Sequence, residues 1–158
     1  MMAALSAAAT NLRAEDWPSW RGLRGDGASL ETNIPVRWGP GDNIAWKTPI
    51  PGKGHASPVV AAGRIYVVTC NEDNQTRRLL CLDRRDGRIL WQREVLKAPL
   101  EGKNRLNSYA SSTPAADDKR VWVTFLAAPK VWVACYDTQG KELWRVCPGE
   151  HYSKHGYC

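Results

Sequence analysis

The sequence predicts an all-β protein made of repeated four-stranded units, and three observations support that prediction. No window of useful length shows the 3.6-residue apolar period of a helix. Short runs of β-branched and aromatic residues, for example 65–69 and 121–125, are bounded by turn-forming residues. The segment 55–95 recurs, piece by piece, as the segment 111–146.

The internal repeat contains four strand-like pieces in the same order in both copies. The matched pieces are 56–60 with 112–116, 64–69 with 120–125, 80–83 with 134–137, and 87–91 with 140–144. Gly87 and Gly140 are the first residues of the fourth piece, at the turn that follows the third, where glycine can take the positive φ of a tight hairpin. Each copy therefore predicts one sheet of four antiparallel strands.

A third, partial copy precedes the two full ones. Residues 43–48 match only the last strand of a unit; their Trp46 stands 45 residues before Trp91, which stands 53 before Trp144. Four-stranded repeats of about this length are what the blades of a β-propeller require. We expect blades at 55–96 and 108–147, an outer strand at 43–50 that completes the last blade of a ring, and the start of a third blade at 151–158.

The N-terminal region divides into two segments. Residues 1–14 are small and mostly apolar and are typical of the end of a signal peptide, so we expect a periplasmic or secreted protein. Their apolar stretch is far shorter than the ~20 residues that a membrane-spanning helix needs, so no membrane span is expected. Residues 15–42 are rich in Trp, Gly and Pro. We expect an irregular lead-in held by its Trp side chains rather than by sheet hydrogen bonds, with a linker as the alternative.

The overall composition is that of an ordered domain with an unusual aromatic content. Of the 158 residues, 43% are hydrophobic and 24% are charged, and eight Trp stand against one Phe. Trp is large and rigid and carries one N–H donor, so it suits a docking role that recurs in each unit. The net charge of +6 comes from basic residues scattered through the expected turns, so no nucleic-acid partner is expected.

The five cysteines form no CxxC pair, and they do not stand at zinc-like spacing from the three histidines. No metal site is therefore expected. Cys70 and Cys81 can either pair as a disulfide across a hairpin or remain as small buried thiols inside strands.

The two turn regions carry a family resemblance. Residues 81–91 and 135–144 resemble the signature of the pyrroloquinoline-quinone-like (PQQ-like) repeat, which has a small residue, an Asp, a turn Gly, and a Trp four residues after that Gly. The resemblance implies that the Trp of each blade docks against the neighbouring blade and forms a girdle around the ring. That role falls to Trp46, Trp91 and Trp144.

The opening of the chain is similar to a group of exported PQQ-like propellers from planctomycete-type bacteria. The similarity rests on residues 16–22, which begin Asp-Trp-Pro, and on residues 46–52. Such propellers have about eight blades. Two blades and one closing strand cannot close such a ring, so the resemblance implies that the chain is the N-terminal fragment of a longer protein.

The resemblance allows two functions. The first is a non-catalytic binding or scaffold module, like the outer-membrane assembly lipoprotein built of such repeats, with no cofactor expected and a protein or small molecule as partner. The second is a fragment of a PQQ-dependent quinoprotein dehydrogenase, with PQQ and calcium in the channel. The chain lacks the adjacent cysteines of those enzymes, and Asp83 and Asp137 are placed to hold turns. We therefore expect no catalytic residue, and the first function is favoured.

Polar residues precede the innermost strand of each expected blade. They are His55, Asn107, Tyr109 and His155. Equivalent loops of a propeller converge on one face, and binding residues favour loops on a rigid scaffold. We hypothesise that these four residues line a ligand-binding surface, with hydrogen bonding between blades as the alternative.

Overall fold

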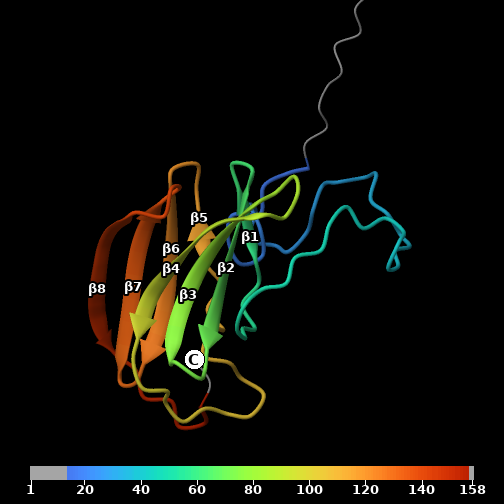
Figure 1. The fold of residues 1–158 in the computed structure, drawn as a ribbon. Helices are drawn as coiled ribbons and strands as arrows, with labels where there is room; N and C mark the ends of the chain where they lie inside the picture. Colours follow the sequence, from blue (N-terminus) through green and yellow to red (C-terminus); the bar gives the residue numbers. More distant parts are fainter. Residues whose placement is uncertain (1–13, 157–158) are drawn as a thin grey trace, which may run out of the picture.

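The computed structural model describes residues 14–156 and contains two four-stranded antiparallel sheets and, in that range, no helix (Figure 1). The strands of the first sheet, blade 1, are β1 (Val59–Ala61), β2 (Arg64–Asn71), β3 (Thr76–Asp83) and β4 (Ile89–Lys97). Those of the second, blade 2, are β5 (Ala115–Ala116), β6 (Arg120–Ala127), β7 (Lys130–Asp137) and β8 (Glu142–Glu150). The predicted all-β fold with four-stranded antiparallel blades is confirmed.

The two blades have the same strand order and the same register. Each sheet runs in sequence order from a short inner strand to an outer strand. In blade 1, Tyr66 of β2 lies opposite Cys81 of β3, which lies opposite Trp91 of β4. In blade 2 the corresponding row is Trp122, Cys135 and Trp144. This common row allows any residue of one blade to be matched with its counterpart in the other.

The turns between the third and fourth strands are built alike in both blades. Gly87 and Gly140 have φ of +70° and +78°, the left-handed region that favours glycine. The carboxylate of Asp83 accepts the backbone N–H of Arg85 at 2.9 Å, and that of Asp137 accepts the N–H of Gln139 at 2.8 Å. Both aspartates therefore hold their own turns, which is the role expected from the sequence.

The hydrophobic core lies between the two blades. Blade 1 contributes one face of β2 and β3, and blade 2 contributes alternate residues of β6 together with Tyr136. The buried side chains at the centre are Val59, Tyr66, Val68, Leu79, Cys81, Val121, Val123 and Phe125. Burial raises the pKa of Tyr66, whose hydroxyl has no hydrogen-bond partner among the described residues.

The opposite face of blade 2 is less covered. It carries Trp144 and Val146, which are 42% and 47% exposed, and every residue of β8 is exposed. β8 is an edge strand, and this explains why it continues through Pro148 to Glu150 although the sequence predicted its end at 147.

The lead-in lies along the inner edges of both blades, as the blue segment beside β1 and β5 in Figure 1 shows. Trp17 exchanges two backbone hydrogen bonds of 2.8 Å with Val60 of β1, and Ala116 of β5 donates its N–H to the carbonyl of Pro18 at 2.8 Å. The expectation that this segment is held by Trp side chains rather than sheet hydrogen bonds is therefore wrong. The free edges of the short inner strands offer backbone donors and acceptors, and the lead-in pairs with them.

Two further segments named from the sequence contain no strand in the structure. Residues 44–50 form no strand, because no strand of blade 1 or blade 2 runs beside them and a strand needs a neighbour for its ladder. Residues 151–156 likewise form no strand, as do the residues that precede β1 and β5, so a third blade at 151–158 stays a prediction. The expected signal-peptide remnant at 1–14 lies, apart from its last residue, outside the described residues.

The cysteines in the described range are free thiols. Cys70, Cys81 and Cys135 are buried and Cys147 is exposed. Cys70 lies opposite Arg77 in the β2–β3 ladder whereas Cys81 lies opposite Tyr66, so the two cysteines are four rungs apart and do not form the disulfide considered from the sequence.

Neither a metal-binding group nor a membrane-spanning helix is found within residues 14–156. In that range no three His, Cys, Asp or Glu side chains come together in a group that could hold a metal ion. No helix in the same range has the length and hydropathy to cross a membrane.

Candidate functional site

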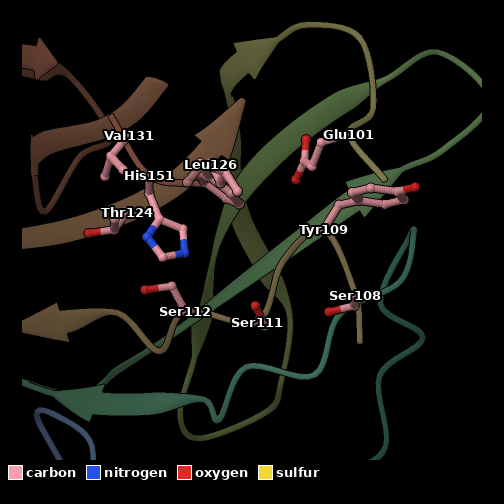
Figure 2. Close-up of a pocket in the computed structure, with 10 residues that line it drawn as sticks. Glu101, Ser108, Tyr109, Ser111, Ser112, Thr124, Leu126, Val131 and His151 are labelled. Atoms are coloured by element: carbon pink, nitrogen blue, oxygen red, sulfur yellow. The ribbon is translucent and has the colours of Figure 1, made fainter. Parts of the chain in front are cut away.

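A cavity of about 240 Å³ lies where the loop that enters blade 2 meets the ends of β6 and β7. Its polar lining includes Ser108, Ser112, Thr124 and His151, and its apolar lining includes Phe125, Leu126 and Val131. Figure 2 shows the imidazole of His151 projecting into the group of side chains, with Tyr109 and Glu101 at the other end. The cavity is therefore lined by apolar side chains of β6 and β7 and by polar side chains from the loop, from β6 and from the segment after β8.

The loop that enters blade 2 is held by Asn107. This residue is 9% exposed, its Nδ2 donates to the carbonyl of Gly156 at 3.1 Å, and its Oδ1 accepts the N–H of Ser108 at 2.9 Å. Asn107 thus links the loop to the segment that follows β8, and the hydrogen bonds of its side-chain amide hold the loop in place.

The same loop is also bonded to blade 1. The backbone N–H of His55 lies 3.0 Å from both Ser108 Oγ and the carbonyl oxygen of Ala110, and Ala56 donates to that carbonyl at 3.1 Å. The segments before β1 and β5 therefore lie side by side, and the backbone of His55 takes part in hydrogen bonding between blades.

Tyr109 stands at the cavity wall next to a buried ion pair. The guanidinium of Arg77 lies 5.8 Å from the centre of the Tyr109 ring, and the ammonium of Lys103 lies 5.1 Å from it. Arg77 is fully buried and donates to Glu101 at 2.5 Å and to the carbonyl of Ala98 at 2.9 Å. Burial raises the pKa of the Tyr109 hydroxyl, so the phenol stays neutral at physiological pH.

The four residues proposed from the sequence are placed differently from one another. Tyr109 lines the cavity, Asn107 lies behind it in the loop, and the exposed side chains of His55 and His155 do not line it. His151 lines it instead.

His151 was not singled out from the sequence, although the repeat contains the signal that locates it. His151 stands seven residues after Trp144, as Ala98 stands seven after Trp91. The N–H of His151 donates to Pro129 and that of Ala98 to Gln75, so the two residues make equivalent backbone bonds at the end of the outer strand. Comparing the two copies at this position would have shown a histidine where the first copy has alanine.

The tryptophans named from the sequence meet turns of the blades. Trp46 Nε1 donates to the carbonyl of Arg84 at 3.1 Å, and its ring lies over Gly87, where a Cβ would collide with it. Trp91 Nε1 donates to the carbonyl of Thr138 at 3.0 Å, and a Cβ on Gly140 would lie 2.8 Å from its ring. The described residues contain no such turn against Trp144.

A second hydrogen bond accompanies each of these tryptophans. Thr48, two residues after Trp46, donates its hydroxyl to the carbonyl of Gly87 at 2.7 Å. Arg93, two residues after Trp91, donates its Nε–H to the carbonyl of Gly140 at 2.7 Å. At both interfaces, the Trp ring therefore packs over the turn glycine, and a second side chain donates a hydrogen bond to the carbonyl of that glycine.

Comparison with known families gives one match. The family model described as outer membrane protein assembly factor BamB matches residues 40–145. No curated protein matches the chain.

Solved structures similar to the chain include two dehydrogenases and one assembly factor, all much longer than this chain. They are a quinohemoprotein alcohol dehydrogenase, ADHIIG, from Pseudomonas putida HK5 (23% identity, 57% of this chain and 12% of that chain, TM-score 0.42), BamB from Moraxella catarrhalis (19%, 66% and 28%, TM-score 0.49), and a europium-containing methanol dehydrogenase (16%, 58% and 15%, TM-score 0.42). The chain spans 12–28% of the length of these proteins.

Proposed function

Because the chain belongs to the PQQ-like repeat family of outer membrane protein assembly factor BamB, whose model matches about two-thirds of it, we propose that it is part of a non-catalytic β-propeller that binds a partner on one face. The partner is a protein or a small molecule, and the place of action is the periplasm or the outside of the cell. The family's description as an outer membrane protein assembly factor supports a protein partner and a place of action at the cell envelope.

The observation that carries this proposal is the convergence of three loops at one end of the blades. The segment before β1, the loop before β5 and the segment after β8 are joined by the hydrogen bonds of His55 to Ser108 and of Asn107 to Gly156. A cavity is lined by the loop before β5 and by His151 of the segment after β8, together with residues of β6 and β7. Loops fixed on a rigid β scaffold are the usual position of binding residues.

The opposite end of the inner strands is occupied by the chain itself. Trp17 and Pro18 pair with the inner strands, and the carboxylate of Asp16 accepts the N–H of Ala62 at 2.8 Å in the β1–β2 turn. The end with the cavity therefore leaves more room for a partner than the end with the lead-in.

The alternative, a PQQ-dependent dehydrogenase, finds no support in these two blades. Calcium prefers several oxygen ligands in one place, and residues 14–156 bring no such group together. Asp83 and Asp137 are engaged by the N–H groups of their own turns. Within residues 14–156 these contacts give no support for a quinone–calcium site.

Site-specific photo-crosslinking tests the proposal. A photoreactive amino acid replaces Ser112 in the cavity or, as the control, Asp118 in the exposed β5–β6 turn at the lead-in end. The purified chain is irradiated with a periplasmic extract, and adducts are identified by mass spectrometry. We expect the same adduct repeatedly from Ser112 and none from Asp118. Equal labelling from both positions would contradict a binding face at the cavity end.

Incubation with PQQ and CaCl₂ tests the alternative. We expect no saturable quenching of tryptophan fluorescence and no dye-linked oxidation of alcohols by the purified chain. Saturable binding together with dye reduction would replace the proposed function by the dehydrogenase.

A further inference from the structure

The two repeats differ at one position of the third strand. Four residues before Cys81 stands Arg77, and four residues before the matching Cys135 stands Val131. The two positions are equivalent because each of these cysteines lies opposite the docking Trp of its own blade. A long cationic side chain in blade 1 is thus replaced by a short apolar one in blade 2.

In blade 1, the side chain of Arg77 occupies the space between β3 and the chain that follows β4. Arg77 is fully buried, bonds to Ala98 just after β4, and forms its ion pair with Glu101. In blade 2 Val131 is too short to reach the chain after β8, and the cavity of about 240 Å³ lies beside it. The cavity therefore follows from a difference between the repeats.

Several hydrogen-bonding groups in this cavity are left for an occupant. Among residues 14–156, the hydroxyls of Ser112 and Thr124 and the imidazole of His151 make no hydrogen bond. Ser108 is 5% exposed, and its Oγ accepts the N–H groups of His55 and Ala110, which leaves its own proton to donate. Ser112 and Thr124 are half-buried and His151 is exposed, so an occupant that bonds to them replaces hydrogen bonds to water.

The charged and apolar residues that line the cavity restrict which ligands can bind there. The carboxylate at the cavity, Glu101, is already paired with Arg77, so the lining presents no unpaired carboxylate. Phe125, Leu126 and Val131 form an apolar wall. The volume is below the ~300–1,000 Å³ of pockets for drug-sized ligands, so the occupant is smaller than those.

We propose that this cavity binds an uncharged polyol or monosaccharide. Its hydroxyl groups bond to Ser112, Thr124 and His151, and its C–H face packs on the apolar wall formed by Phe125, Leu126 and Val131. The inference rests on the proposed function, because it names a ligand class for the same binding face.

Saturation-transfer NMR on the purified chain, with D-glucose, myo-inositol and N-acetylglucosamine as probes, tests this inference. Val131→Arg restores the side chain that fills the equivalent space in blade 1, and the double variant Ser112→Ala with Thr124→Val removes two hydroxyls. Val146→Arg adds the same charge as Val131→Arg on the exposed β8, outside the cavity, and is the matched control.

We expect at least one probe to bind saturably, with affinity reduced about tenfold or more in Val131→Arg and in the double variant but unchanged in Val146→Arg. Near-UV circular dichroism reports folding, and if Val131→Arg does not fold, the double variant decides. Failure of all three probes to bind, or binding that is unchanged in the double variant, would overturn the inference. If photo-crosslinking gives a protein adduct at Ser112 but none of the three probes binds, the proposed function stands and only this inference fails.

Discussion

The indole N–H of Trp91 in blade 1 donates a 3.0 Å hydrogen bond to the carbonyl of Thr138 in blade 2, and its ring covers Gly140. This contact joins the outer strand of one blade to a turn of the next. It buries an aromatic ring and satisfies its only donor in one step. The first prediction concerns the glycine beneath the ring.

Gly140→Ala is expected to lower the free energy of unfolding by about 2–4 kcal/mol, since the residue has φ of +78° and the new Cβ would meet the Trp91 ring at 2.8 Å. Urea denaturation followed by tryptophan fluorescence measures the change. Gly102→Ala is the control, because that glycine has open space around its Cβ position and no positive φ. Equal stability of the two variants would show that the ring does not rest on Gly140.

Arg77→Ala is expected to lower the free energy of unfolding by about 3–5 kcal/mol. The substitution leaves the carboxylate of Glu101 unpaired, and only 9% of that side chain is exposed. Lys53→Ala breaks the exposed pair with Glu72 and should cost less than about 1 kcal/mol. Thermal unfolding of both variants provides the comparison. A small loss for Arg77→Ala would mean that water reaches Glu101.

The stability of the protein is expected to fall as the pH rises from about 10 to 12. Burial, together with the hydrogen bond to Glu142, raises the pKa of Tyr136 from 10.0 to about 12, so the unfolded chain loses this proton before the folded chain does. The stabilisation is complete below pH 10 and is lost as the pH rises through the folded pKa. Tyr136→Phe should make this fall of stability with pH less steep, as measured by urea midpoints across that range. An unchanged dependence on pH would mean that groups other than Tyr136 cause the fall.

Among the four cysteines in the described range, Cys147 is expected to react first with iodoacetamide. It is exposed, whereas burial raises the pKa of Cys70, Cys81 and Cys135 and shields their thiols. Peptide mass spectrometry after timed labelling gives the rate for each residue. In urea all four should react at similar rates, and fast labelling of Cys81 without denaturant would argue against the packed core.

Asp16→Ala is expected to loosen the lead-in. The carboxylate accepts the N–H of Ala62 at 2.8 Å and an Arg84 N–H at 3.2 Å, and losing these bonds should cost about 1 kcal/mol. Hydrogen exchange should become faster at the amide of Ala116, which bonds to Pro18 in the same segment. Asp42→Ala, whose carboxylate makes no bond to any described residue, should leave that amide unchanged.

The strands and turns were predictable because their signals are local. Alternating β-branched residues and a turn glycine act within a few positions, and two copies of the pattern reinforce each other. The pairing of Trp17 with Val60 has no such signature, since an open strand edge accepts any backbone that reaches it. The repeat comparison singles out His151 as the histidine that replaces Ala98, but whether its side chain lines the cavity depends on the path of the chain after β8, which brings His151 and not His155 to the lining.

The bond between Pro18 and Ala116 has a consequence for the order in which the protein folds. Most of the described chain separates the two residues, so this contact closes a long loop and is costly in entropy until both blades exist. During synthesis, the lead-in leaves the ribosome before the two blades and completes its native contacts only after β5 has formed. Until then its tryptophans remain available to chaperones or to other chains.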